Sequence, residues 1–317
     1  ASTVITASPS VGSTFTGWSG GCTGTGTCAL STSGTLNTTV TATFTSSISA
    51  QTITVTTPAP ASAIYDNTFP VAATASSGLG VAITTTGSCS GSGTSSAIIT
   101  MTSGTGSCVV HYNQAGNGTY SAASEVTSNT TATKRAVSAN ITADDKAYDS
   151  TTFANVSACE LSGQVGGDDV TCSSPDGNFL DKHVGIGKSV LVLSGITLGG
   201  TDAADYELVS DSDADAADIT PYTGIIATAT ADDKPYDATT AATALLSFGN
   251  VFLGDDLTPS GYTSATFDTA NVGTNKTVTV LGITGSGADV GNYTWNTSDT
   301  DLADITAVDA VCTIVGY

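Results

Sequence analysis

The chain has 317 residues, 35 of them glycine, and only 11% of its residues are charged. Its 28 acidic and 7 basic side chains give a formal net charge of −21. Basic patches hold phosphate groups, so this balance argues against nucleic-acid binding and against attraction to an anionic membrane. No apolar run approaches the roughly 20 residues of a transmembrane helix, and the first residues lack the charged and apolar segments of a signal peptide.

The composition predicts an all-β fold. Thr, Val, Ile, Tyr and Ala alternate with Gly, Asn and Asp, a mixture typical of short strands joined by tight turns. Bulky side chains are scarce, which favours several small cores over one large core. We therefore expect tandem small β-sandwich domains arranged as a rod.

The first segment, residues 1–47, contains the sequence FTGWSG around Trp18, followed by Cys22 and Cys28. It is similar to the divergent InlB-type B repeat of secreted bacterial proteins. Such a repeat normally begins with a further pair of strands. The resemblance therefore implies a partial β domain that lacks its N-terminal strands.

The second segment, residues 48–135, contains the pattern QTI, SSGL, two cysteines, QAGN and a tyrosine, which begins at Gln51 and ends at Tyr120. It resembles the Ig-like repeats of bacterial extracellular proteins. The resemblance implies an Ig-like β-sandwich in which Cys89 and Cys108 tie two strands together.

The third and fourth segments, residues 136–221 and 222–308, are two copies of one repeat. TADDKAYDSTT at 142–152 returns as TADDKPYDATT at 230–240, and a Gly-Asp-Asp turn and an acidic or amide residue before a tyrosine recur downstream. Strands such as Val190–Leu193 and Thr277–Val280 alternate at the spacing of a sandwich. These motifs resemble the YDG-type repeats of large bacterial surface proteins.

Both copies depart from the YDG pattern. Ser150 and Ala238 stand where the family has glycine, and the first copy reads Ala204-Asp205-Tyr206 in place of Gly-Asn-Tyr. We expect the turns to differ locally and the fold to be kept. The paired acids, such as Asp168-Asp169 and Asp255-Asp256, are interpreted as turn residues because they recur in both copies, and the tyrosines of the YD motif are interpreted as core or corner residues.

The last segment, residues 309–317, is a short tail that no repeat motif includes. As a strand it would place Val311, Thr313 and Val315 on one side and Ala310, Cys312, Ile314 and Gly316 on the other. An opened β-sandwich exposes unpaired backbone groups and an apolar groove, both costly in water. The tail is therefore a candidate donor strand for the first domain of a neighbouring subunit, in a head-to-tail homopolymer. The alternative is that the sequence boundary merely cuts the first repeat.

Seven cysteines indicate the compartment. Six of them fall into local pairs in Ser/Thr/Gly-rich surroundings without CxxC or Cys/His clusters, which favours disulfides and an oxidising environment. The alternative is that all seven are reduced small hydrophobes. We predict the three disulfides Cys22–Cys28, Cys89–Cys108 and Cys159–Cys172. Cys312 is left unpaired and is a candidate intersubunit contact.

The sequence contains few candidate residues for catalysis or metal binding. The two histidines, His111 and His183, lie outside any nucleophile or metal motif, so we expect no enzyme and no catalytic residue. Asp211, Asp213 and Asp215 form an alternating carboxylate cluster of the type that calcium accepts, but no glycine-turned binding loop follows. We therefore prefer to interpret these three residues as a solvated acidic loop that binds no calcium. No cofactor other than calcium is indicated by the sequence.

These observations predict a structural subunit of a secreted, extracellular or cell-surface bacterial fibre or adhesin stalk. A glycan-binding adhesin module is the alternative from another class, and it would show a cluster of exposed aromatic side chains at one end. A non-polymerising stretch of a giant surface adhesin is the third interpretation.

Overall fold

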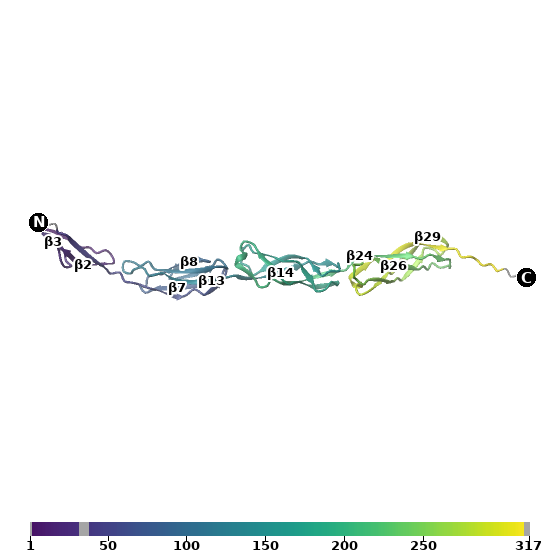
Figure 1. Ribbon diagram of the computed structural model, residues 1–317, viewed down its shortest axis with the longest axis horizontal. Coiled ribbons are helices and arrows are strands. Elements are labelled where there is room, and N and C mark those ends of the chain that lie inside the picture. The colour runs from purple at the N-terminus through teal and green to yellow at the C-terminus, as the bar shows by residue number, and fades with distance from the viewer. Residues whose placement is uncertain (1, 32–37, 314–317) are drawn as a thin grey trace. The chain divides into compact units, whose positions relative to one another are not determined.

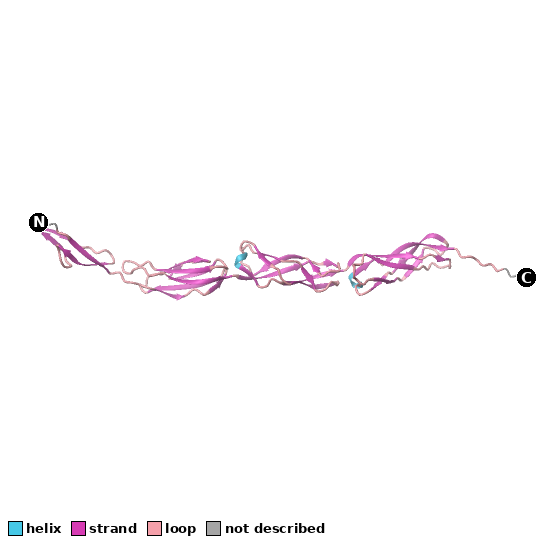
Figure 2. Ribbon diagram, in the orientation of Figure 1, coloured by secondary structure: helices cyan, strands magenta, loops and turns pink. Residues whose placement is uncertain are grey.

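The computed structural model describes residues 2–31 and 38–313, whose regular secondary structure is almost entirely β-strand (Figure 1). Two short 3₁₀ turns, η1 (Ala203–Asp205) and η2 (Val290–Asn292), are the only helical segments of these residues (Figure 2). The predicted all-β fold class is therefore confirmed.

The chain forms two compact units. One contains Ala1–Val137, Gly163–Val170 and Gly200–Glu207, and the other contains Ser138–Ser162, Thr171–Gly199 and Leu208–Tyr317. The first repeat copy contributes segments to both units. Contacts between the Ig-like segment and the first copy therefore lie inside one unit, and contacts between the two copies lie inside the other.

The described residues of the first β domain form two separate two-stranded antiparallel sheets, β1 with β3 and β2 with β4. Trp18 and Cys28 are its only buried apolar side chains among residues 2–31 and 38–47. A pair of strands alone is at best marginally stable in water. The strands of this domain are Ser2–Ile5 (β1), Ser13–Gly20 (β2), Cys28–Ser31 (β3) and Val40–Ser46 (β4).

The second segment forms a nine-stranded sheet in the order β5-β7-β11-β10-β8-β12-β13-β6, with β9 beside β11. Its core is built from alternate inward residues of these strands, including Val71, Ile83, Ile99 and Val110. The strands are Ile53–Thr57 (β5), Ser62–Ile64 (β6), Thr68–Ala75 (β7), Ala82–Gly87 (β8), Cys89–Ser90 (β9), Gly93–Thr94 (β10), Ser96–Met101 (β11), Ser107–Asn113 (β12) and Val126–Thr133 (β13).

The motif residues of the second segment meet around the side chain of Gln51, which is buried. Its amide nitrogen donates to the Ser121 carbonyl at 2.7 Å, and its amide oxygen accepts the hydroxyl of Ser77 at 2.5 Å. The Gln114 side chain lies beside it at 3.3 Å. The widely spaced QTI, SSG and QAGN elements are thus parts of one polar cluster.

The first repeat copy forms a three-stranded sheet β17-β14-β22, a five-stranded sheet β15-β23-β20-β19-β16 and the pair β18-β21. Its strands are Arg135–Ala143 (β14), Lys146–Ala147 (β15), Phe153–Ala154 (β16), Val156–Ser162 (β17), Thr171–Ser173 (β18), Gly177–Phe179 (β19), Gly185–Val192 (β20), Thr197–Gly199 (β21), Tyr206–Leu208 (β22) and Asp213–Thr220 (β23).

The second copy has the corresponding sheets β26-β24-β31, β25-β32-β29-β28 and β27-β30, and an isolated bridge between Ala241 and Thr266 stands where the first copy has a fifth strand, β16. Its strands are Tyr222–Ala231 (β24), Lys234–Pro235 (β25), Ala244–Gly249 (β26), Thr258–Gly261 (β27), Ser264–Phe267 (β28), Gly273–Leu281 (β29), Thr284–Ser286 (β30), Tyr293–Trp295 (β31) and Ser298–Thr306 (β32).

Alternation along the strands makes each copy a sandwich. Val190 and Val192 of β20 are buried, whereas Leu193 just beyond is 80% exposed. In the second copy, Ala227 of one sheet packs in the same core as Val278 of the other. The strand expected at Thr277–Val280 lies in β29, and the one expected at Val190–Leu193 is the end of β20, which stops one residue earlier, at Val192.

The turns at the missing glycines keep the left-handed backbone. Ser150 has φ 65° and Ala238 has φ 64°. The two copies therefore share the left-handed backbone at this turn, and the expected local difference from the family's turn stays a prediction. The turns are imposed by their surroundings, and each copy carries a residue that is less suited than glycine to that conformation.

Candidate functional sites at the joints and at the first β domain

A carboxylate of the first Gly-Asp-Asp turn joins the Ig-like segment to the first repeat copy. Asp168 Oδ2 accepts hydroxyl hydrogen bonds from Tyr65 at 2.9 Å and from Tyr206 at 2.5 Å. The two rings pack edge to face with centroids 5.5 Å apart. Arg135 donates to the Tyr65 carbonyl at 3.5 Å and, through Nε, to the Gly163 carbonyl at 3.0 Å. We call these contacts the Asp168 joint.

The residue before the second tyrosine strengthens the same joint. Asp205 Oδ1 accepts from the Ser103 hydroxyl at 2.7 Å and from the Gly104 amide at 2.6 Å. A Cβ atom at Gly104 would lie 2.6 Å from the Asp205 carbonyl oxygen, so only glycine permits this approach. The departure from Gly-Asn-Tyr in the first copy thus places a charged acceptor at the joint.

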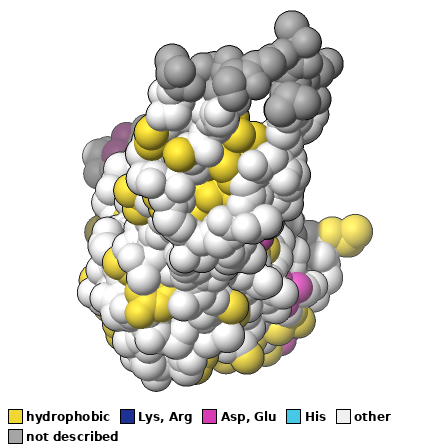
Figure 3. All heavy atoms as spheres, turned by 90° about the vertical axis from the view of Figure 1, so that its left-hand side faces the viewer, with side chains coloured by type: hydrophobic (Ala, Val, Ile, Leu, Met, Phe, Trp, Pro, Cys, Tyr) yellow, Lys and Arg dark blue, Asp and Glu magenta, His cyan; other side chains and the backbone are white. Residues whose placement is uncertain are grey.

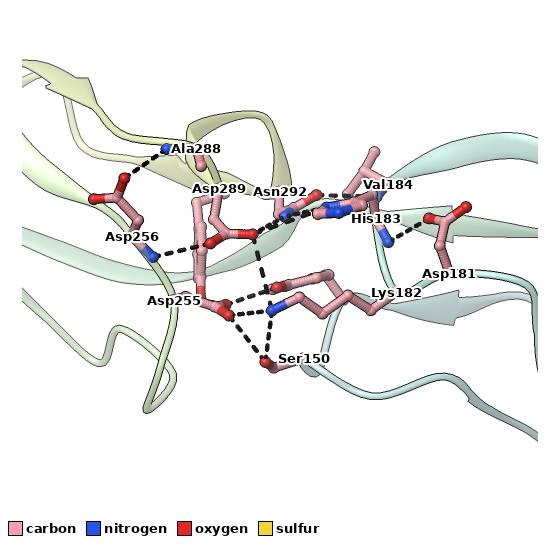
Figure 4. Close-up of polar contacts among 12 residues, drawn as sticks. Ser150, Asp181, Lys182, His183, Val184, Asp255, Asp256, Ala288, Asp289 and Asn292 are labelled. Atoms are coloured by element: carbon pink, nitrogen blue, oxygen red, sulfur yellow. Dashed lines mark hydrogen bonds and ion pairs between the residues drawn. The ribbon is translucent and has the colours of Figure 1, made fainter.

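The second Gly-Asp-Asp turn repeats the arrangement between the two copies (Figure 4). Asp255 Oδ2 accepts from Tyr148 at 2.7 Å and from Tyr293 at 2.5 Å. Its Oδ1 accepts from the Ser150 hydroxyl at 3.0 Å and pairs with the Lys182 ammonium. The Asp255 side chain is 0% exposed. We call this cluster the Asp255 joint.

The contacts of the Asp255 joint determine which of its titratable groups are charged at neutral pH. Burial alone would raise the pKa of Asp255, but hydrogen bonds from Lys182, Tyr148 and Tyr293 outweigh it and lower that pKa to about 2. Burial and the adjacent carboxylate raise the pKa of both tyrosine hydroxyls. The hydrogen bond to Asp255 raises the pKa of the Lys182 ammonium. All donors therefore keep their protons at neutral pH.

Further polar and apolar contacts complete the Asp255 joint. Asn292 Oδ1 accepts the Val184 amide at 3.0 Å, and its amide nitrogen lies 3.2 Å from His183 Nδ1 (Figure 4). Buried side chains of both copies form one core cluster, which lines the joint: Tyr148, Ala154 and Phe179 from the first copy, with Ile225, Leu257 and Tyr293 from the second.

Sequence reasoning missed both joints. It interpreted the paired acids as turn residues of the fold and the YD tyrosines as core or corner residues. Asp168 and Asp255 do lie in turns, but their carboxylates bind tyrosines of the preceding segment. Tyr148 is a core residue at 1% exposure, whereas Tyr236, at 41% exposure, fits only the corner interpretation. The usable signal was that the YD, GDD and DY/NY motifs recur together.

The predicted cysteine pairs are disulfide bonded in the structure. Cys22 is joined to Cys28, Cys89 to Cys108, and Cys159 to Cys172. Cys312 is exposed and free. Cys89 of β9 and Cys108 of β12 are buried in the core of the nine-stranded sheet, and their bond ties these two strands together, as the Ig-like resemblance implied.

The alternating acids at 211–215 act within the fold. Asp213 and Asp215 belong to β23, and each carboxylate accepts a backbone amide of β14, from Ile141 and Ala143 respectively, at 2.9 Å. The preferred interpretation of a solvated loop is therefore wrong for these two residues. The part of the chain that the structure describes contains no group of three or more His, Cys, Asp or Glu side chains placed to hold a metal ion.

The second copy uses the same device. Asp299 and Asp301 of β32 accept the amides of Ala229 and Ala231 of β24, each at 2.8 Å. Side-chain carboxylates thus bridge the two sheets of each sandwich in place of backbone pairing. The D-x-D pattern is a sheet-bridging motif here, and its recurrence at 299–301 was the signal available in the sequence.

The first β domain leaves apolar side chains in contact with solvent. Val4 is 58% and Phe44 is 42% exposed. The Phe44 ring packs at a tilt against Phe15, with centroids 5.5 Å apart, and Phe15 packs edge to face with Trp18, with centroids 5.1 Å apart. Figure 3, viewed from the side of Figure 1 on which the N-terminus lies, shows hydrophobic side chains among uncharged ones and no Lys or Arg.

The tail residues at the other end of the sequence are exposed. Val311 is 90% exposed, and residues 307–313 adopt no regular secondary structure. Cys312 and Thr313 are likewise exposed. Ile314 and Val315, also named as candidate intersubunit residues, lie outside the described residues.

The fold and the joints define a class, a chain of tandem β domains in which recurring motif residues form contacts between neighbouring segments. The chain belongs to the YDG domain family, whose model matches residues 131–214 and 220–301. The divergent InlB B-repeat domain matches residues 1–48. Both matches confirm resemblances predicted from the motifs. The domain boundaries, and the Ig-like assignment of residues 48–135, stay predictions.

Other comparisons add less. A comparison with curated proteins gave no significant match. Solved structures that match include the I9–I11 tandem from titin, at 10% identity and a TM-score of 0.25, over 81% of this chain and 100% of that chain. At these values the likeness adds nothing to the fold described above.

These findings identify the broad character of the protein. Repeat domains of these families are typical of structural or adhesin proteins. Local disulfides and an InlB-type repeat are features of extracellular or surface proteins. No helix in the described ranges has the length and apolar character needed to cross a membrane.

Proposed function

We propose that this protein is a structural subunit of a secreted bacterial fibre or adhesin stalk, and that it polymerises head to tail by strand addition to its first β domain. The observation that carries this proposal is the small core of that domain. Its described residues form two two-stranded sheets and bury only Trp18 and Cys28. An added strand would pair open backbone edges and cover side chains such as Phe44.

The tail is the proposed donor. Its described residues are exposed, and Val311 is 90% exposed. The tail alternates apolar side chains, so that as a strand it would present Val311, Thr313 and Val315 to one face. Because acceptor and donor lie at opposite ends of the sequence, the contact is heterologous and propagates.

The two joints support the proposed role as a fibre or stalk, which must carry a mechanical load. Each links neighbouring segments through a carboxylate that accepts two tyrosine hydroxyls, and the local disulfides limit how far a segment extends when it unfolds. The exposed aromatic side chains of the described residues, Phe44, Phe153 and Tyr236, come from separate segments. A sugar-binding platform needs several on one face, so the fibre is preferred over a glycan-binding module.

The test replaces residues 309–317 with a Gly/Ser segment of equal length and examines the protein by electron microscopy. We expect filaments from the unchanged protein and none from the variant. The matched control is Cys312→Ser, which keeps the strand pattern and removes only the thiol.

Circular dichroism and thermal unfolding of the variant must match those of the unchanged protein, so that the loss is one of assembly. Filaments that persist without the tail would refute strand donation by these residues. Filaments lost equally with Cys312→Ser would show that a disulfide, and not strand addition, links the subunits.

A further inference from the structure

Three tyrosines occupy equivalent places in successive segments. The amide of Tyr65 donates to the Thr133 carbonyl at 2.9 Å, that of Tyr148 to Thr220 at 2.8 Å, and that of Tyr236 to Thr306 at 2.9 Å. Each acceptor lies at the end of the last strand of its segment, beside a short parallel strand. The three tyrosines therefore project from the same corner of three sandwiches.

Two of these tyrosines are engaged and one is not. The hydroxyls of Tyr65 and Tyr148 bind Asp168 and Asp255 of the next repeat copy. The hydroxyl of Tyr236 has no hydrogen-bond partner among the described residues, and its side chain is 41% exposed against 1% for Tyr148.

A second point of attachment is also free in the last copy. At the Asp255 joint the Val184 amide donates to Asn292. The Val-Gly pair of the second copy begins at Val272, which is 52% exposed and whose amide has no partner in the described part of the chain. Ala238 takes the place of Ser150 with the same left-handed backbone.

We propose that Tyr236, Ala238 and Val272 form a terminal acceptor surface that binds the Gly-Asp-Asp turn of a further YDG domain, placed after Thr306 as the second copy is placed after Thr220. The carboxylate of that turn accepts the Tyr236 hydroxyl, and the Asn or Asp before its conserved tyrosine accepts the Val272 amide. The occupant is another YDG domain because both Gly-Asp-Asp turns of this chain already bind a tyrosine of the preceding segment, with Asp168 bound to Tyr65 and Asp255 to Tyr148.

The charge at this surface predicts how strongly it binds. Asp181 and Lys182 of the first copy correspond to Thr269 and Ala270 of the second, so the ammonium that pairs with Asp255 has no counterpart. The new joint therefore resembles the Asp168 joint, in which hydroxyls and not an ammonium meet the carboxylate.

The test extends the full chain after Thr306 with a third copy of residues 221–306 in place of residues 307–317. Tyr236→Phe is then made in the original and the extended chains. We expect no change of Tm in the original chain and a drop of several degrees for the added repeat in the extended chain. Tyr148→Phe, which removes a hydroxyl already bound, is the positive control and should lower the Tm of both chains.

A second readout does not depend on stability. Hydrogen exchange at the Val272 amide should slow by at least tenfold in the extended chain, because the amide gains an acceptor. An equal effect of Tyr236→Phe in both chains, with unchanged exchange at Val272, overturns the proposal. So does an added repeat that stays unfolded, since the same sequence folds after Thr220. The extended chain lacks the tail, so neither result bears on strand donation.

Discussion

The two YDG copies share a polar framework. Lys146 binds the Asp149 carboxylate at 2.7 Å and the Thr151 carbonyl at 2.9 Å, and Lys234 binds Asp237 at 2.8 Å and the Thr239 carbonyl at 2.9 Å. Each lysine also lies 5.6 Å from the centre of a phenylalanine ring. The K-x-YD-x-TT motif therefore folds one turn in the same way twice.

The copies differ at the strands that close one edge of each sandwich. The first copy joins β17 to β18 through Cys159–Cys172. The corresponding strands of the second copy carry Leu246 and Pro259 instead, and nearby Phe248 stacks on Trp295 with centroids 5.0 Å apart. The two copies therefore share the polar framework of the motif turn. The contact that closes the sandwich edge is a disulfide in the first copy and an apolar aromatic contact in the second.

Removing the acceptor carboxylate of each joint should show the largest effects. Asp255→Ala leaves two hydroxyls and the Lys182 charge without their acceptor, and we expect it to destabilise the second unit by about 3–5 kcal/mol. Asp168→Ala leaves only two tyrosine hydroxyls without their acceptor and should destabilise its unit by about 2 kcal/mol. Amide hydrogen exchange, read separately in the two units, measures both values.

The control for these variants is Glu160→Ala, which removes an exposed carboxylate of the same unit as Asp255. It should change stability by less than about 0.5 kcal/mol. Equal losses for Asp255→Ala and Asp168→Ala would contradict the role assigned to Lys182.

Breaking the closing contact of each copy should cost comparable amounts by different routes. The double variant C159A/C172A opens a loop with a sequence separation of 13 and should lose about 3 kcal/mol. Trp295→Ala removes the ring stacked on Phe248 and should lose about 2–4 kcal/mol. Urea unfolding under oxidising and reducing conditions separates the two, because reductant should leave the second copy unchanged. A second copy that weakens with reductant would refute this division.

Acid should weaken the Asp255 joint. The pKa of Asp255 is lowered to about 2 in the folded chain, below the value of about 3.9 expected when it is unfolded. A lowered carboxyl pKa adds stability above the unfolded value, and that stability is lost as pH falls through the folded value. About 2 kcal/mol should therefore disappear between roughly pH 4 and pH 2. The free energy of unfolding of Asp255→Asn, measured against pH, should not show this loss. An identical loss in that variant would mean that other acidic residues cause it.

The fold was largely predictable because its signals are local. Alternation at Val190–Leu193 and the repeated TADDK-YD segment are properties of neighbouring residues, and β20 and β24 follow from them. The pairing of Cys159 with Cys172 also rests on a short separation along the chain.

The joints were not predictable in this way because their partners are distant. Tyr65 and Asp168 are separated by 103 positions, and Tyr148 and Asp255 by 107. Each residue has a sufficient local explanation, as a turn acid or a core aromatic, so nothing in one copy calls for a partner. The contact forms only between two different folded segments.

The smallest expected effect separates the two turns that lack glycine. A non-glycine residue in the left-handed region costs roughly 1 kcal/mol, so Ala238→Gly at φ 64° should stabilise the second copy by about that amount. Ser150→Gly relieves the same strain at φ 65° but removes the hydroxyl that donates to Asp255 at 3.0 Å. A hydrogen bond to a charged group contributes about 1.5–3 kcal/mol, so the net effect should be neutral or destabilising. Thermal unfolding of both single variants tests this difference in sign, with Ser150→Ala as the control that loses the hydroxyl and keeps the strain. Stabilisation of equal size by the two glycines would mean that the Ser150 hydroxyl contributes nothing to the Asp255 joint.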